Sequence, residues 1–199
     1  MPGGLVIVIP AAGASLRMRG ADKLLEDVDG LPALRHAAVT AVRSGVPVIV
    51  TLPDGGPHAA PRRAELPGLG VTALPIPDAH EGMAASLRAG VRAAGNAEAV
   101  LVMLPDMPEI TADDLAAMIA AHEAESNRAL RATAYDGTPG HPVVLPRRLF
   151  AEVAVLTGDE GARRVLSGED VGLVRLPGRH AVLDLDTPED WADWRAGRL

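Results

Sequence analysis

The chain has 199 residues, of which 48% are hydrophobic and 23% are charged, and its formal net charge is −7. This length supports one sizeable domain with a buried core, and the acidic balance argues against a general nucleic-acid binder, which needs a basic face. The absence of cysteine excludes disulfides, thiolate zinc sites and cysteine nucleophiles. The apolar run at 5–9 follows no basic segment and is too short for a signal peptide or a membrane span, so we expect a cytoplasmic protein with no membrane partner.

Strands and helices are expected to alternate over the first 125 residues. The expected strands are 5–9, 46–52, 71–76 and 99–104, the expected helices are 31–44, 82–94 and 111–123, a short strand or turn is expected at 24–30, and 53–70 is expected to be loop plus a short helix. The candidates at 5–9, 46–52 and 99–104 are expected to be buried, and 46–52 is almost entirely apolar, as parallel strands covered on both faces are. The alternation predicts the α/β class, with a single doubly wound, mostly parallel (mixed) sheet and helices on both faces.

The rest of the chain is less regular. Its expected strands are 128–134, 142–145 and 171–176, and its expected helices are 147–153, 159–166 and one from Thr187 to the chain end. Thr187 followed by Pro188 and two acids is a typical helix start. We find no repeat or linker, so residues 1–199 are expected to form a single domain.

The loop after the first strand combines small residues with cations. Ala11, Ala12 and Gly13 would let the backbone approach a ligand closely, so that its N–H groups point at anionic oxygens. Arg17 and Lys23 then follow, and Lys23 is the only lysine in the chain. A compact ammonium suits phosphate binding, which predicts a polyphosphate site here; a solvated surface lysine is the alternative.

Functional residue types follow the expected strands at one edge of the sheet, where ligands of α/β proteins bind. The strands end near Gly13, Thr51, Asp78 and Asp106. Asp106 lies between prolines and suits a hard cation such as Mg²⁺, or it is a turn or N-cap aspartate. Neither G-x-x-x-x-G-K-[ST] nor G-x-G-x-x-G follows the first strand, which argues against a P-loop kinase and a nicotinamide dehydrogenase.

Four further side chains have two interpretations each. Asp184 and Asp186, as alternate residues of a strand, would point the same way and either complete a metal site or cap the helix at Pro188. Glu81 either caps the helix at 82–94 or contacts a ligand. His141, between Gly140 and Pro142, is either structural or a substrate contact.

Several motifs together resemble the MobA-like nucleotidyltransferases, and within that group the molybdenum cofactor cytidylyltransferases. They are Ala11-Ala12-Gly13 with Ser15, Arg17, Met18 and Lys23; 29–34 (DGLPAL); 81–87 (EGMAASL); 105–108 (PDMP); 140–143 (GHPV); 158–163 (GDEGAR); and 184–190 (DLDTPED). The resemblance covers nearly the whole chain, and its order and spacing make it specific. Arg19 departs from the family pattern, which often has a glycine there.

The resemblance implies a Rossmann-like nucleotidyltransferase fold and a set of site residues. Lys23, Arg17 and Asp106 would be catalytic, and Asp106 with Asp186 would bind Mg²⁺. The nucleotide- and substrate-binding residues implied are Ala11, Ala12, Gly13, Ser15, Thr51, Asp78, Ser86 and His141. Residues 1–125 would form the nucleotide-binding half and 126–199 the acceptor-binding half of one domain.

The implied reaction transfers CMP from CTP to the phosphate of molybdopterin and releases pyrophosphate. Transfer to another phosphorylated acceptor such as a sugar phosphate, or from GTP, is one alternative. A non-catalytic nucleotide-binding module for molybdoenzyme maturation is the other. The resemblance also implies a transient contact with a molybdoenzyme or its chaperone, and no nucleic-acid partner.

Overall fold

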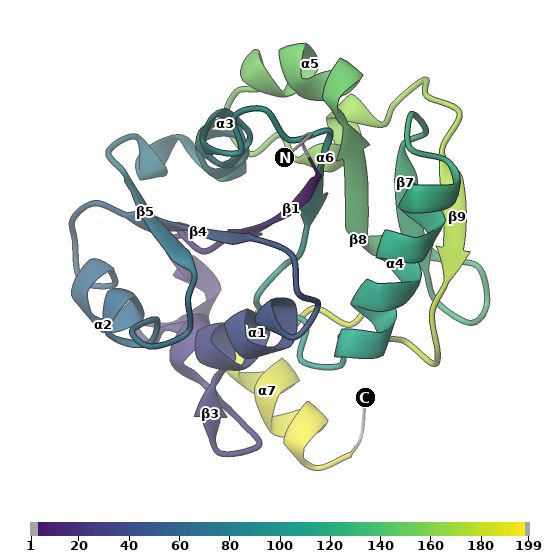
Figure 1. The fold of residues 1–199 in the computed structure, drawn as a ribbon. Coiled ribbons are helices and arrows are strands. Elements are labelled where there is room, and N and C mark those ends of the chain that lie inside the picture. The colour runs from purple at the N-terminus through teal and green to yellow at the C-terminus, as the bar shows by residue number, and fades with distance from the viewer. Residues whose placement is uncertain (1–3, 198–199) are drawn as a thin grey trace.

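The computed structural model describes residues 4–197 and contains a seven-stranded sheet (Figure 1). In spatial order its strands are β5 (Thr72–Ile76), β4 (Val48–Pro53), β1 (Leu5–Pro10), β6 (Ala99–Val102), β8 (Pro139–Pro146), β7 (Leu130–Thr133) and β9 (Gly172–Arg175). Among the described strands of this sheet, β8 alone runs antiparallel to its neighbours β6 and β7. The predicted mostly parallel, mixed sheet is therefore confirmed.

Helices cover both faces of the sheet, as predicted. They are α1 (Ala33–Val42), α2 (Ala59–Ala64), α3 (Met83–Ala93), α4 (Ala112–Ala124), α5 (Phe150–Ala154), α6 (Ala162–Val165) and α7 (Pro188–Arg195). Alternate residues of a strand face opposite sides, so Ile7 packs with α1 and α4 in one buried cluster, and Val8 packs with α3, α5 and α6 in another. No helix within residues 4–197 has the length and apolar character needed to cross a lipid bilayer.

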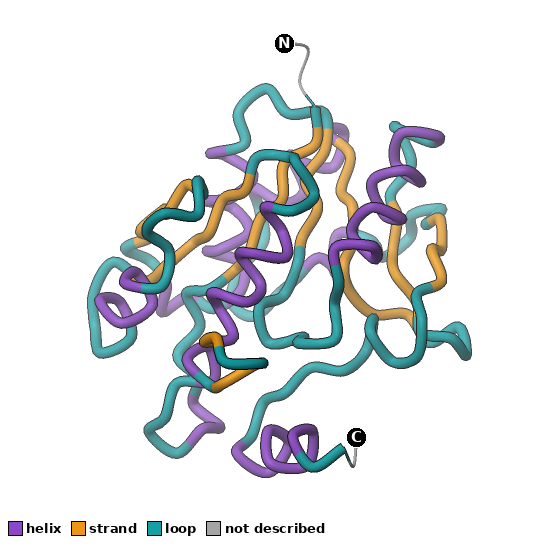
Figure 2. The backbone as a smooth tube through the Cα atoms, turned by 60° about the horizontal axis from the view of Figure 1, so that its bottom comes forward, coloured by secondary structure: helices purple, strands orange, loops and turns teal. Residues whose placement is uncertain are grey.

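Helix α7 lies apart from both layers, beside the loop that follows β1 (Figure 2). Its Trp191 is buried against Met18 and Leu185. The C-terminal helix therefore packs on the predicted phosphate loop. It ends at Arg195 rather than continuing to the chain end, and residues 198–199 lie outside the described range.

Several element boundaries differ from the sequence predictions. A small hairpin of β2 (Asp27–Val28) and β3 (Leu31–Pro32) delays α1 to Ala33, because Asp29 and Gly30 both take positive φ and form a two-residue turn. Strand β8 begins at Pro139, three residues before the strand expected at 142–145. The helices expected at 147–153 and 159–166 shorten to α5, after a 3₁₀ turn, and to the four-residue α6.

The segment that returns from β9 to α7 crosses β8 at Gly140. A Cβ atom on Gly140 would lie 1.6 Å from the carbonyl oxygen of Ala181, and the N–H of His141 donates to that oxygen at 2.8 Å. Farther along, the N–H of Leu185 donates to the carbonyl of Asp106 at 3.0 Å. This crossing brings the acidic segment 184–186 to the end of β6, although Asp106 and Asp184 are 78 positions apart in the sequence.

Candidate active site

A cavity of about 440 Å³ lies at the carboxyl ends of β1 and β6, beside the start of α3. The predicted site residues that line it are Gly13, Ser15, Arg17, Lys23, Ser86, Asp106 and Asp186. They come from four separate stretches of the sequence, the loop at 13–23 and the segments around Ser86, Asp106 and Asp186. The sheet edge thus gathers most of the predicted side chains around one space.

The Lys23 ammonium lies between two carboxylates. Its Nζ is 2.5 Å from Oδ2 of Asp106 and 2.7 Å from Oδ1 of Asp186, and its side chain is mostly buried. Burial alone would lower the pKa of Lys23, but the two carboxylates outweigh it and raise the pKa above its ordinary value. Lys23 is therefore a fixed positive charge at the cavity wall and not a solvated surface lysine.

Asp186 points into the site and does not cap α7. Its Oδ2 is 2.7 Å from Nη1 of Arg17, so Asp186 joins both predicted cations. Thr187 and Asp190 make the helix cap instead, as a reciprocal capping box. The capping interpretation of Asp186 is therefore wrong.

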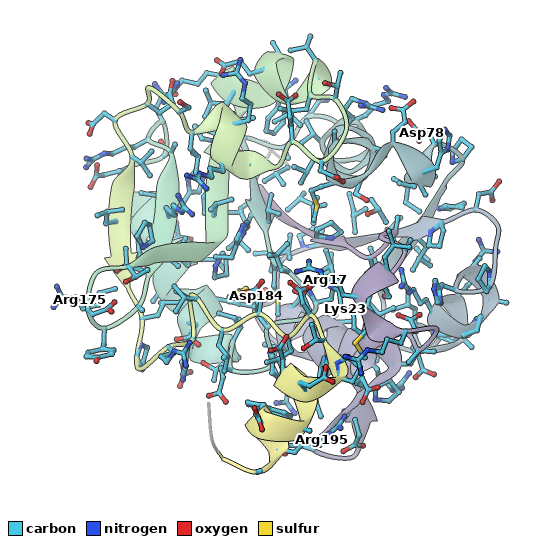
Figure 3. The ribbon with its side chains drawn as sticks, turned by 180° about the vertical axis from the view of Figure 1, so that it is seen from behind. Arg17, Lys23, Asp78, Arg175, Asp184 and Arg195 are labelled. Atoms are coloured by element: carbon cyan, nitrogen blue, oxygen red, sulfur yellow. The ribbon has the colours of Figure 1, made fainter. Side chains whose placement is uncertain are left out.

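Asp184 belongs to the same charge cluster, although it does not lie on a strand as predicted, because residues 181–187 form no regular element. Partial burial raises the pKa of Asp184, and electrostatic repulsion from Asp106 and Asp186 raises it further. Figure 3 shows Asp184 near Lys23 and Arg17, with Asp78 and Arg175 in other parts of the molecule. An excess of carboxylate charge therefore surrounds Lys23.

The donor set fits a magnesium ion bound together with phosphate oxygens. Oδ1 of Asp106 is buried and makes no hydrogen bond within the described chain, so it remains free to coordinate a cation. No group of three or more metal-binding side chains occurs among residues 4–197. Magnesium does not need one, because it usually binds one or two carboxylates, water and substrate phosphates.

A buried arginine that the sequence analysis missed holds the loop after β1. Arg62, from α2, is 0% exposed. It pairs with Asp22 through Nε at 2.7 Å and Nη2 at 2.8 Å, and its Nη1 donates to the carbonyls of Ala11 at 2.8 Å and Gly13 at 2.7 Å. Asp22 in turn accepts the N–H of Leu24 at 3.0 Å. Nothing in the Pro- and Arg-rich segment 53–70 distinguishes Arg62 from the exposed Arg63 beside it, apart from helical spacing.

Arg62 orients the peptide groups of the loop. It draws the carbonyls of Ala11 and Gly13 away from the cavity, while the N–H groups of residues 12–15 make no hydrogen bond within residues 4–197. Successive free N–H groups of this kind form an anion-binding concavity. Ala11 and Ala12 are buried and do not line the cavity with side chains, so they can act only through the backbone.

The Ser15 hydroxyl belongs to this clamp. It donates to Oδ1 of Asp22 at 3.1 Å and accepts from Nη2 of Arg62 at 3.0 Å. Although Ser15 lines the cavity, its hydroxyl is thus committed to shaping the loop. Its left-handed backbone, with φ of 50°, bends the chain at the same point.

Two predicted residues at the strand ends lie outside the cavity lining. Thr51 is fully buried inside β4, opposite Pro10, because that strand continues to Pro53. Asp78 and Glu81 both pair with Arg88 of α3, at 2.9 Å and 2.6 Å. Glu81 makes no cap hydrogen bond to α3, whose N-cap is Gly82.

The opposite wall of the cavity was not predicted as such. Gly82, within the motif at 81–87, has φ of 91°, and a Cβ there would lie 2.3 Å from Oδ1 of Asp159. The N–H of Ala84 donates to the carbonyl of Gly158 at 3.1 Å. Glycine therefore lets the loop at 157–161 approach α3 and carry Asp159 to the cavity.

Arg19 also lies outside the cavity lining, and its Nη2 pairs with Oε1 of Glu189 on α7 at 2.8 Å. Its φ of 53° is left-handed, a conformation that glycine adopts without strain. The observed contact supports loop shaping rather than a phosphate contact for this residue.

His141 does not line the cavity either. Its ring is close enough to Asp106 and Arg131 to interact electrostatically with both. Its Nδ1 is buried and has no hydrogen-bond partner in the described chain. Burial, together with repulsion from Arg131, lowers the pKa of His141 to about 4. The ring is therefore neutral at pH 7.

This low pKa predicts an acid-sensitive fold. In the unfolded chain His141 becomes protonated as the pH falls below its ordinary pKa of about 6.5. In the folded chain it stays neutral until the pH reaches about 4, so acid favours the unfolded state between these two values. Relative to His141→Gln, the native chain should lose up to about 3 kcal/mol of unfolding free energy between pH 7 and pH 4. Urea denaturation at a series of pH values measures the difference, and parallel curves for the two proteins would contradict it.

Comparisons with known proteins agree with this geometry. The sequence model of a family described as the MobA-like NTP transferase domain matches residues 7–175. The purine catabolism protein PucB of Bacillus subtilis (strain 168) is 28% identical over 201 residues, with 94% of each chain covered. The crystal structure of Rv0371c from Mycobacterium tuberculosis H37Rv has a TM-score of 0.81 and 27% identity, over 100% of this chain and 99% of that one. A structure of Rv0371c in complex with manganese has a TM-score of 0.78 and 25% identity, over 95% of this chain and 96% of that one.

Proposed function

The chain belongs to the family of MobA-like NTP transferase domains, and from this membership we propose that it transfers CMP from CTP to the phosphate of molybdopterin. An oxygen of the acceptor phosphate forms the new bond to the α-phosphorus of CTP. The bond from that phosphorus to the bridging oxygen breaks, and pyrophosphate leaves. The product is a CMP–molybdopterin diphosphate, which would pass to a molybdoenzyme or its chaperone.

The observation that carries this proposal is the position of Lys23. A buried ammonium held between Asp106 and Asp186 lies at the wall of a cavity whose loop presents free N–H groups. Phosphoryl and nucleotidyl transfer need positioned positive charge more than acid–base groups. The arrangement supplies such charge on one side of the cavity.

Each group of this chain then has a role in the proposal. The backbone at Ala11, Ala12 and Gly13 binds the triphosphate, and Lys23 and Arg17 stabilise the charge that develops on its oxygens. Ser86, which lines the cavity, would contact the nucleotide. Residues 1–125 carry the nucleotide, and 126–199 carry the acceptor and contribute Asp186.

Asp106 and Asp186 would hold Mg²⁺ in this proposal. The unpaired Oδ1 of Asp106 supports the assignment. The ion would neutralise phosphate charge and act as a Lewis acid on the nucleotide. The manganese in the Rv0371c structure supports a divalent cation in general.

Pyrophosphate release tests the proposal. The purified protein is incubated with molybdopterin, Mg²⁺ and each of the four nucleoside triphosphates in turn. We expect CTP to give the highest rate, and chelation by EDTA to abolish release until Mg²⁺ is restored. Preference for GTP, or activity only with a sugar phosphate as acceptor, would contradict the assigned substrates.

Calorimetry separates the enzyme from a mere binding module. For the enzyme, the affinity for CTP should rise when Mg²⁺ is present, because the carboxylates otherwise repel the triphosphate. Magnesium-independent CTP binding without pyrophosphate release from any nucleotide would favour the non-catalytic module.

A further inference from the structure

A second cleft lies on the same side of the sheet as α6. It has a volume of about 290 Å³, and Arg131 of β7 and Arg163 of α6 line it together with Ser167. Arg131 lies directly opposite Leu173 in the pairing of β7 with β9, so both side chains leave the same face of the sheet. This Arg131–Arg163 cleft is thus formed by the sheet on one side and α6 on the other.

The cleft gathers positive charge without a counter-charge. None of the described residues that line it is Asp or Glu. Arg131 donates only to the neutral carbonyls of Gly140 at 3.0 Å and Pro139 at 3.3 Å, and the exposed guanidinium of Arg163 has no hydrogen bond or ion pair within residues 4–197. Burial and the nearby Arg163 lower the pKa of Arg131, which shows that the two guanidinium groups repel one another.

Other arginines nearby are paired with acids. Arg164, the next residue along α6, pairs with Glu160, and Arg148 pairs with Glu169. In a chain with 26 acidic residues against 19 basic ones, counter-charges are abundant. Two facing arginines without one therefore form a site that a bound anion would stabilise.

The cleft is connected to the proposed active site through the residues between them. Arg131 donates a hydrogen bond to the carbonyl of Gly140. The next residue, His141, interacts electrostatically with both Arg131 and Asp106. On the other side, the loop that carries Asp159 to the main cavity leads directly into α6 and Arg163. The loop at 157–161 therefore joins the two cavities along the chain, and His141, which lines neither of them, is close to a charged residue of each.

We propose that Arg131 and Arg163 form an anion-binding subsite for a second negatively charged group of the acceptor, remote from the phosphate that reacts. The apolar side chains of Leu166, Val171 and Leu173 line the same cleft and would pack against the body of such a molecule. This assignment of the anion to the acceptor rests on the proposed nucleotidyl transfer. The subsite selects acceptors with two charged ends over simple monophosphates.

Anion binding itself is tested with inorganic phosphate. The Nε–H of Arg131 is fixed by a hydrogen bond to Gly140, so its NMR signal can be followed during a phosphate titration. We expect a saturable shift that Arg163→Gln weakens roughly 10- to 100-fold, since it removes one charge-assisted contact. Arg164→Gln is the matched control and should bind phosphate as the native protein does. No saturable shift, or equal shifts in the native protein and Arg163→Gln, would overturn the subsite.

Steady-state kinetics test the assignment to the acceptor. Arg163→Gln should raise the KM for the acceptor roughly 10-fold or more, without raising the KM for CTP. An unchanged acceptor KM in a variant that has lost phosphate binding would overturn that assignment. If the native protein shows no nucleotidyl transfer, the proposed function fails and the acceptor assignment fails with it, whereas the phosphate titration still decides whether the subsite exists.

Discussion

Lys23→Ala should lower kcat roughly 10²–10³-fold, the effect of removing one preorganised charge from a transition state. Lys23 is a buried ammonium between Asp106 and Asp186, and no other cation of residues 4–197 pairs with both carboxylates. Circular dichroism should show an intact fold, because Lys23 contributes no side chain to the sheet core. Turnover within tenfold of the native value would contradict the proposed role.

The same variant gives a second readout that a purely structural lysine would not change. The ammonium and a divalent cation compete for the oxygens of Asp106 and Asp186, so removing the ammonium should strengthen metal binding. Titration with Mn²⁺, followed by electron paramagnetic resonance, measures this affinity. We expect tighter Mn²⁺ binding together with slower turnover in Lys23→Ala, and weaker Mn²⁺ binding would contradict the placement of the metal at these two carboxylates.

Arg62→Met should cost about 3–5 kcal/mol of unfolding free energy, because it leaves the buried carboxylate of Asp22 without its guanidinium partner, with Nδ1 of His58 remaining at 3.2 Å. Burial alone would raise the pKa of Asp22, but Arg62, together with the N–H of Leu24 and with His58, outweighs it and keeps the pKa below its ordinary value. The loss should therefore be smaller at low pH, where protonation of Asp22 removes the unpaired charge. Urea denaturation at pH 7 and pH 4 measures both quantities.

A double variant separates the stability role of Arg62 from its role in the loop. Arg62→Met with Asp22→Leu removes both buried charges and should recover part of the lost stability. It should not recover nucleotide binding, because the carbonyls of Ala11 and Gly13 still lack their donor. Recovery of both properties would show that the clamp only stabilises the fold.

Arg147→Met is the matched control for Arg62→Met. Arg147 also donates to two backbone carbonyls, those of Gly95 and Ala97, each at 2.9 Å, but it is exposed and distant in the fold from the cavity lining. We expect a change in unfolding free energy within about 1 kcal/mol and no change in nucleotide affinity.

Much of the architecture followed from local pattern. The apolar runs that became β1, β4 and β6 are covered on both faces, and the intervening helical spacing gave α1, α3 and α4. The predicted boundaries were wrong where contacts between elements outweigh the local pattern. Helix α1 starts late because the residues before it form the hairpin whose turn includes Asp29. Strand β8 extends to Pro139 because it pairs with β7. Short helices such as α6 are too brief for periodicity to define.

Sequence alone singled out the residue types of the candidate site, and tertiary structure decided its geometry. A small-residue loop, a single lysine and an aspartate after a buried strand are local features whose chemical character does not depend on the fold. The contacts of Asp186 with Lys23 and Arg17, and of Arg62 with Asp22, join residues 163, 169 and 40 positions apart. Contacts over such separations depend on how the chain crosses the sheet. The local sequence pattern around each residue does not predict which distant residue it will contact. For the same reason, Thr51 and Ser15 could be placed near the site from sequence, but only the packed structure shows that one is buried in a strand and that the other holds the loop.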